Sequence, residues 1–180
     1  MVASINHTEF FEKSRKFFEN GDILNTLENY QKAMERIDRT QKQDKTEYIQ
    51  FLETILKHCQ DNNLPEEEAL ALRALGRTYS LFKQHAESMK YHYLSLKIQK
   101  KLGKKLETAE GLVFLAEDLE VSGNFNKCVE IFKEAEEIFQ DLGKLKNVKE
   151  IKKEISRLQE FSREMVEDEY MLQKFNVDKY

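Results

Sequence analysis

Cysteine and histidine, the side chains that most often carry out catalysis, are few in this chain and poorly placed for it. Cys59 follows His58 directly, and a thiol beside an imidazole is a combination used for nucleophilic catalysis. Consecutive residues of a helix point about 100° apart, however, so position alone does not make these two a nucleophile and its base. The only other cysteine is Cys128, and two widely separated cysteines are typical of small buried apolar residues. The sequence therefore predicts no catalytic residue.

Metal and nucleotide chemistry find equally little support in the sequence. His85 and His92 are seven residues apart and share one face of a helix, but a metal site needs further ligands. The carboxylate run Glu164, Glu167, Asp168 and Glu169 lacks the spacing and the glycine of a calcium loop, and it is typical of a solvated face. The six glycines are isolated, and no glycine-rich phosphate loop occurs. We therefore expect no metal, no cofactor and no enzymatic activity.

The composition indicates a helical protein of the cytoplasm. Charged residues make up 34% of the 180 residues, hydrophobic residues make up 40%, and one proline leaves few breaks for an all-β fold. No apolar stretch approaches the roughly 20 residues that span a bilayer, and the first residues lack the apolar core of a signal peptide. The net charge of −4 argues against nucleic-acid binding, and the lysine group at 97–105 closes a predicted helix, where cations complement the helix dipole.

Apolar residues recur at helical spacing along most of the chain and predict eight helices with no strand. The polar stretch 38–47 predicts a loop, and "DNNLPEEE" at 61–68 ends one helix and starts the next, because proline is tolerated in a first helical turn. We expect helices near 7–18, 22–37, 46–60, 66–82, 84–102, 105–122 and 124–141, and from 145 to about 175.

Two stretches repeat one spacing at a distance of forty residues. Residues 72–103 and 112–143 share leucines, aromatic residues and a closing Leu-Gly at the same offsets. Small residues recur at two matched places, Gly76 with Ala116 and Ser88 with Cys128. Stacked helix pairs need such a pattern, because each pair presents the same surface to the next and small residues permit close crossings.

The motifs of these stretches resemble those of the tetratricopeptide repeat (TPR) family. "LRALGRTYSLFKQHAESMKYHYLSLKI" fits the family's first helix, large-x-x-Leu-Gly-x-x-Tyr, and its second helix. "NGDILNTLENYQKAMERI" and "SGNFNKCVEIFKEAEEI" fit the turn and the second helix. The forty-residue period resembles the longer variant found in kinesin light chains and spindle-orientation adaptors. The resemblance implies an all-α solenoid of stacked antiparallel helix pairs, a TPR-like superhelix with a C-terminal capping helix.

This interpretation makes residues 1–180 a single helical-repeat domain, with some departures from the family pattern. The parts are repeat-like units at about 7–40, 66–104 and 105–144, an extra helix at 46–60 and a capping helix at 145–175. In the first unit Lys13 and Ser14 take the Leu-Gly places. The extra helix is interpreted as half of a degenerate unit, and the helix after 145 matches nothing in the motif.

The resemblance also implies a concave groove, formed by the first helix of each pair, that holds a peptide or helix of another protein. The groove-facing positions are Phe11, Arg15, Phe18, Arg73, Arg77, Ser80, Val113, Glu117 and Glu120. Arg73 and Arg77 lie one turn apart and could seat a carboxylate. The alternative is that they pair with acids of the chain itself, such as Glu110 or Glu117. The family's carboxylate-clamp residues are absent, so binding of chaperone tails is not implied.

The sequence leaves two interpretations of function. The first is a non-catalytic adaptor or scaffold that binds other proteins of unknown identity in the groove. The second is a structural subunit of a larger cytoskeletal or ciliary assembly that uses the outer faces and the C-terminal helix. The second is suggested by the apolar residues near the end of the chain, Met165, Met171, Leu172, Phe175 and Tyr180. Self-association through the N-terminal helix pair is also left open.

Overall fold

A computed structural model describes residues 7–37 and 44–177, with side chains up to residue 165. In these residues the chain forms eight α-helices and no strand, as predicted. The helices are α1 (His7–Glu19), α2 (Ile23–Glu35), α3 (Thr46–Asp61), α4 (Pro65–Leu81), α5 (His85–Lys101), α6 (Lys105–Val121), α7 (Phe125–Asp141) and α8 (Leu145–Val177). Residues 38–43 of the predicted loop and the last residues of the first predicted unit lie outside the described residues. The side chains of Met171, Leu172, Phe175 and Tyr180 lie outside them as well. No helix in the described part is long and apolar enough to cross a bilayer.

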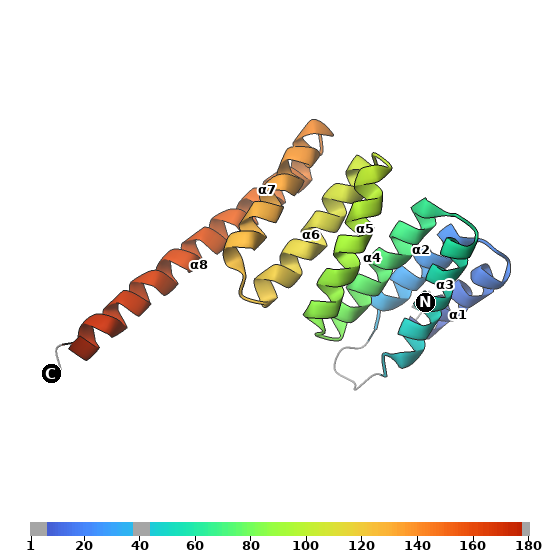
Figure 1. Cartoon of the computed structure of the whole chain (residues 1–180), viewed down its shortest axis with the longest axis horizontal. Helices are drawn as coiled ribbons and strands as arrows, with labels where there is room; N and C mark the ends of the chain where they lie inside the picture. The colour runs from blue at the N-terminus through green and yellow to red at the C-terminus, as the bar shows by residue number, and fades with distance from the viewer. Residues whose placement is uncertain (1–6, 38–43, 178–180) are drawn as a thin grey trace, which may run out of the picture. The chain divides into compact units, whose positions relative to one another are not determined.

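The helices pack as sequential antiparallel pairs in two compact units, Met1–Lys104 and Lys105–Tyr180. In the first unit α1 pairs with α2 and α4 pairs with α5, while α3 packs along α4 (Figure 1). In the second unit α6 pairs with α7, and α8 packs along α7. The prediction of a single domain over 1–180 stays a prediction.

An aromatic cluster forms the core around α1, α2 and α3. The ring of Phe11 makes edge contacts with Tyr30, Tyr48 and Phe51, at centroid distances of 6.0, 4.9 and 5.4 Å. The Tyr30 hydroxyl reaches Thr78 of α4 at 2.9 Å, and burial raises the pKa of Tyr30 above its ordinary value. The extra helix α3 therefore helps to enclose a core that α1 and α2 alone leave open.

The repeat extends further toward the N-terminus than the sequence motifs indicate, because α3 ends as α5 and α7 do. Asn63, Gly103 and Gly143 stand forty residues apart and all have positive φ, at 54°, 69° and 67°. After each one, a backbone N–H reaches back five residues, in the bonds Leu64 to Cys59, Lys104 to Gln99 and Lys144 to Phe139. Such a bond over a left-handed residue closes a Schellman turn. Helices α1, α4 and α6 close with the same turn, so the turn itself does not identify a second helix. The forty-residue register of Asn63 with Gly103 is what gives α3 the position of a second helix.

The matched small residues mark the places where paired helices touch. In the α4–α5 pair the Ser88 hydroxyl donates a hydrogen bond to the Gly76 carbonyl oxygen at 2.7 Å. Forty residues later the Cys128 thiol donates to the Ala116 carbonyl oxygen at 3.1 Å. Gly76 also lies against the ring of His92, so close that a Cβ at this position would stand 2.7 Å from the nearest ring atom. The predicted close crossings are confirmed in both pairs.

Helix α8 begins in register with the first helices, since Pro65, Lys105 and Leu145 are spaced by forty residues. One side of it buries Val148, Ile151, Ile155 and Leu158. At the places where α6 buries Leu112, Ala116 and Leu119, α8 carries the exposed residues Lys152, Ser156 and Gln159. A polar outer face ends a stack of repeats. The helix predicted to match nothing in the motif is therefore a first helix in position, and its residues make it a cap.

Candidate functional site

Helix α4 carries the predicted basic residues as one stripe. Arg73, Arg77 and Ser80 follow a four-and-three spacing, which places them on one face of the helix, and all three are half-buried. Each makes an interaction with another group of the chain. Both arginines lie within α4, and their role in binding stays a prediction. A partner carboxylate would add to their existing contacts or replace them.

The predicted site residues of α1 have packing roles in the structure. Phe11 is only 4% exposed, and Phe18 packs against Phe51 and His58 at centroid distances of 5.8 and 5.6 Å. Arg15 lies 4.8 Å above the Phe11 ring, and its guanidinium bonds Glu47 of α3 at 2.5 Å. Helix α3 thus covers this side of α1. The expectation that Phe11 faces an open groove is wrong, because α3 supplies the aromatic rings that bury it.

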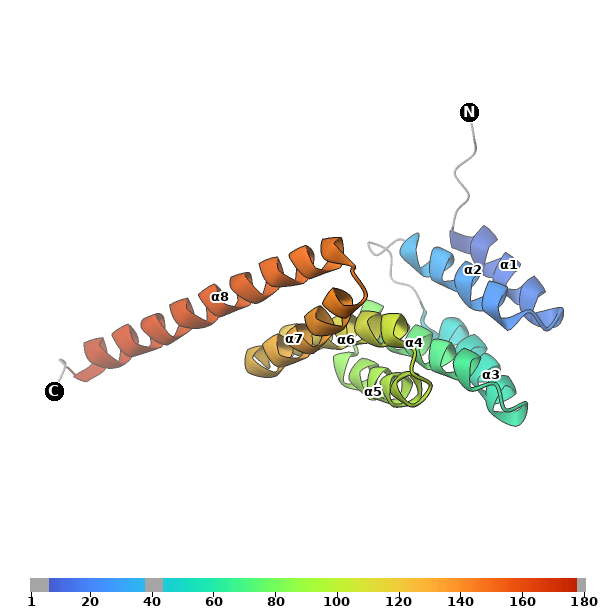
Figure 2. The ribbon, with the colours of Figure 1, turned by 90° about the horizontal axis from the view of Figure 1, so that it is seen from above.

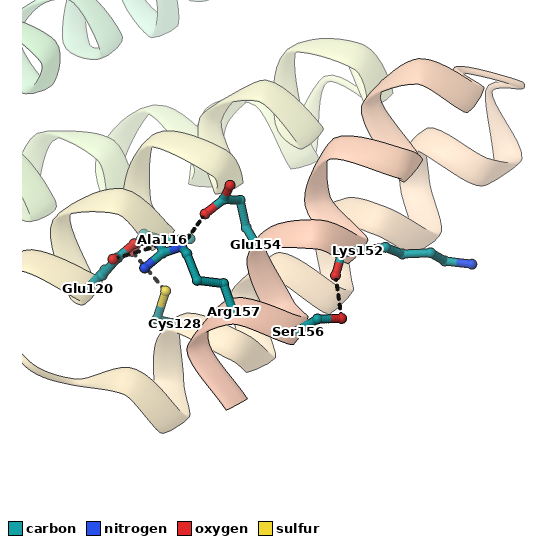
Figure 3. A network of polar contacts seen from close by, with 7 residues as sticks. All are labelled: Ala116, Glu120, Cys128, Lys152, Glu154, Ser156 and Arg157. Carbon is teal, nitrogen blue, oxygen red and sulfur yellow. Dashed lines mark hydrogen bonds and ion pairs between the residues drawn. The ribbon is translucent and has the colours of Figure 1, made fainter. Parts of the chain in front are cut away.

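Glu120, predicted on α6 as a groove residue, is held by α8. The guanidinium of Arg157 donates two hydrogen bonds to the Glu120 carboxylate, at 2.8 and 2.9 Å (Figure 3). Arg157 also donates to Glu154 at 2.8 Å, and the two carboxylates raise the pKa of the guanidinium. Of the other residues predicted on α6, Val113 is half-buried and Glu117 is exposed. A cationic partner at Glu120 would have to displace Arg157.

Figure 3 shows that this ion pair and the α6–α7 crossing lie next to each other. The Cys128 thiol points at Ala116, one turn before Glu120, and Arg157 reaches across from α8. Lys152 forms a second, looser link from α8 to Glu136 of α7, at 3.5 Å. The Arg157 contact was not predicted from the sequence. The sequence held one indication of this contact, namely the position of Arg157 in the repeat. Arg157 stands forty residues after Glu117 and eighty after Arg77.

Both cysteines, His58 and His92 are placed for packing. Cys59 is fully buried, whereas the neighbouring His58 ring lies against Phe18, so the two side chains point to different surroundings. Burial raises the pKa of Cys59 and of Cys128 to about 11. Both are therefore thiols at neutral pH, and a thiol is a poor nucleophile. His92 is buried at the Gly76 crossing. Among the described residues, no three His, Cys, Asp or Glu side chains converge as a metal site.

Comparison with known proteins shows the fold. No family model matches the chain, and no curated protein matches its sequence. Among solved structures, the apo form of RapI is similar with a TM-score of 0.52 and 16% identity, over 77% of this chain and 57% of that one. A Signal Transduction ATPase with Numerous Domains from Pyrococcus horikoshii, which has a tetratricopeptide repeat sensor, is similar with a TM-score of 0.56 and 16% identity, over 81% of this chain.

These similarities make the fold TPR-like, an all-α arrangement of helix pairs. The chain spans about half of the length of RapI and 25% of the length of the archaeal ATPase. At 16% identity the likeness concerns the fold alone.

Proposed function

We propose that this protein is a non-catalytic interaction module, an adaptor or scaffold in the cytoplasm, and that it binds a peptide or helix of a partner protein along its first helices. The TPR-like fold supports protein binding in general. The forty-residue period supports the longer repeat variant of kinesin light chains and spindle-orientation adaptors. The observation that carries the proposal is the pair of half-buried arginines, Arg73 and Arg77, one turn apart on α4.

The chemistry of this stripe favours a carboxylate in the partner. Guanidinium groups form paired hydrogen bonds with carboxylates, and half-burial strengthens such bonds because less water competes for them. A guanidinium–carboxylate contact also occurs within the chain, where Nη2 of Arg157 donates to both oxygens of Glu120. We therefore propose that Arg73 and Arg77 receive an acidic side chain or a free C-terminus, with Ser80 as a further donor.

The test needs a defined ligand. Peptides that bind the immobilised full chain would be selected from a random library, and their affinities measured by calorimetry. The proposal predicts that acidic peptides or acidic C-termini are enriched. It also predicts that Arg73→Glu/Arg77→Glu weakens binding at least tenfold, because each charge-assisted hydrogen bond contributes about 1.5–3 kcal/mol.

A matched control separates this effect from general charge repulsion. Lys149→Glu/Lys153→Glu makes the same change of charge at the same spacing, on exposed positions of α8. The control should leave affinity within about twofold of the original chain, as surface charges contribute little. Equal losses in the two variants, or full affinity in Arg73→Glu/Arg77→Glu, would refute the arginine site.

A second function, a structural subunit of a larger cytoskeletal or ciliary assembly, is favoured by the form of α8. Both views show that α8 is longer than α7 and continues beyond the N-terminal end of α7 (Figures 1 and 2). Phe161, which contacts the first residue of α7, and Met165, one turn further along α8, are 43% and 50% exposed. Removing residues 163–180 keeps the buried spine of α8 up to Leu158 and should abolish incorporation into the assembly. Unchanged incorporation of the shortened chain would count against this function.

A further inference from the structure

Helix α5 has a solvent face that combines exposed apolar and basic residues. Tyr93 and Leu94 are 49% and 42% exposed, although both are large and apolar. Lys90, Lys97 and Lys101 are exposed beside them. These five residues, spaced three, four, seven and eleven positions from Lys90, lie along one stripe of the helix and are called the α5 face below.

The α5 face is strongly positive for a chain whose net charge is −4. Helix α5 contains four lysines and one acidic residue, Glu87 in its first turn. Just after the last residue of α5, Lys104 pairs with Glu66 of α4 at 2.7 Å. An apolar centre with a basic rim is suited to an acidic amphipathic helix, which can bury its apolar side and pair its carboxylates.

The end of α8 is such a helix. Its burial stops at Leu158, and from there to Met165 every residue is exposed except the half-buried Ser162. The Phe161 ring keeps one contact with Phe125 at 5.3 Å, and the helix then continues to Val177. The sequence "EMVEDE" at 164–169 adds four carboxylates. Most helical stability in proteins comes from tertiary packing, so a surface that covers this exposed end would stabilise it.

We propose that the α5 face of one copy binds the end of α8, residues 161–177, of a second copy of the same chain. Charge complementarity supports this occupant, since the α5 face carries three lysines and the sequence at 164–169 carries four carboxylates. The two surfaces are on the same chain, so two copies can form both contacts reciprocally, as in a closed twofold dimer. Phe161 and Met165 would pack over Tyr93 and Leu94. This inference does not depend on the arginine site of α4.

Sedimentation of the full chain over a range of concentrations tests the proposal. The chain should dimerise, and added salt should weaken the dimer because exposed charges form its rim. Lys97→Glu/Lys101→Glu should weaken dimerisation about tenfold or more, as two attractive pairs become repulsive. Lys149→Glu/Lys153→Glu is the control, since both variants shift the net charge by −4, from −4 to −8, and only the first alters the α5 face.

Reversing the charges on both surfaces, each in a different variant, tests the pairing of α5 with α8 more directly than one variant does. Glu164→Lys/Asp168→Lys reverses the end of α8, and it should weaken dimerisation as Lys97→Glu/Lys101→Glu does. A mixture of these two variants should form a heterodimer of near-original affinity, because each altered surface then meets its reversed counterpart. A variant that has merely lost structure would show no such recovery.

Three results would overturn the proposal. The first is an original chain that stays a monomer at all concentrations. The second is a Lys97→Glu/Lys101→Glu chain that dimerises like the control. The third is a mixture of the two variants that forms no heterodimer. Docking of α8 within one chain would appear as a monomer whose α5 amides are protected at every concentration, and this too would overturn it.

Discussion

The effect of Gly76→Ala on the stability of the protein depends on one neighbouring residue, His92. Its sign is set by how closely Gly76 contacts the His92 ring. Gly76 lies in the middle of α4, where alanine usually stabilises a helix by about 1 kcal/mol relative to glycine. Three atoms of the His92 ring lie 2.7, 2.8 and 2.9 Å from the place of the added Cβ. Separations below 3.0 Å do not occur for relaxed carbon atoms, so either the buried His92 ring or the two helices must shift. We predict that Gly76→Ala destabilises the protein.

The magnitude follows from these two opposing effects. Overpacking a well-packed core costs about 1–3 kcal/mol, and the gain in helix propensity offsets about 1 kcal/mol of it. Gly76→Ala should therefore lower the free energy of unfolding by about 0–2 kcal/mol. In a His92→Ala background the imidazole ring is absent. There, Gly76→Ala should raise the free energy of unfolding by up to about 1 kcal/mol.

Urea denaturation of the four chains of this double-mutant cycle, followed by circular dichroism, measures both effects. The difference between the two backgrounds should be about 1–3 kcal/mol, the coupling expected for residues in direct contact. If Gly76→Ala changes stability equally with and without His92, the two residues do not share a tight crossing, and the explanation of the small-residue pattern is refuted.

Three further predictions follow from other contacts. Burial raises the pKa of Cys59 and Cys128 from 9.0 to about 11, so unfolded thiols ionise first, and urea titrations should show stability falling between about pH 9 and 11. A Cys59→Ala/Cys128→Ala chain should lose less stability in that window, and an equal loss would contradict the assignment. Arg157→Ala should speed hydrogen exchange in α8 yet change the free energy of unfolding by at most about 1 kcal/mol, because the pair with Glu120 is partly exposed. Recovery by Glu120→Arg/Arg157→Glu supports this role, and unchanged exchange in Arg157→Ala opposes it. Lys83→Gly should raise Tm, since Lys83 has φ 60° and a left-handed residue other than glycine costs about 1–2 kcal/mol; a lower Tm would contradict this.

The helices and their pairing could be predicted because they depend on local pattern. The helix predicted at 66–82 is Pro65–Leu81, and the one predicted at 124–141 is Phe125–Asp141. The same pattern identified the close crossings, since Ser88 and Cys128 both bond to the carbonyl of a small residue twelve positions earlier. A period of forty residues records the spacing of contacts even where few residues are identical.

The register of α3 and of α8 was harder to recognise, because the marker residues are replaced. At the end of α3, Asn63 stands in place of the glycine of the closing turn, and asparagine is the residue that most readily shares its left-handed conformation. In α8, Lys152 and Gln159 replace apolar residues, and the replacement is what makes the helix a cap. In both cases the backbone keeps the repeat while the side chains depart from it.

For the candidate site, the sequence predicts positions within one helix but not contacts between helices. The shared face of Arg73 and Arg77 follows from helix geometry alone, and the structure has both on α4. The burial of Phe11 depends instead on where α3 lies, and the link from Glu120 to Arg157 depends on α8. Both are contacts between distant parts of the sequence, so a motif aligned within one repeat does not reveal them.

The central claim is that the arginine-bearing face of α4 receives an acidic segment of a partner. Hydrogen exchange of the full chain, with and without a bound acidic peptide from the selection, tests it most directly. We expect the peptide to protect amides of α4, from Pro65 to Leu81, and Arg73→Glu/Arg77→Glu to abolish this protection. Protection confined to other helices, or protection of α4 that persists in the variant, would contradict the account.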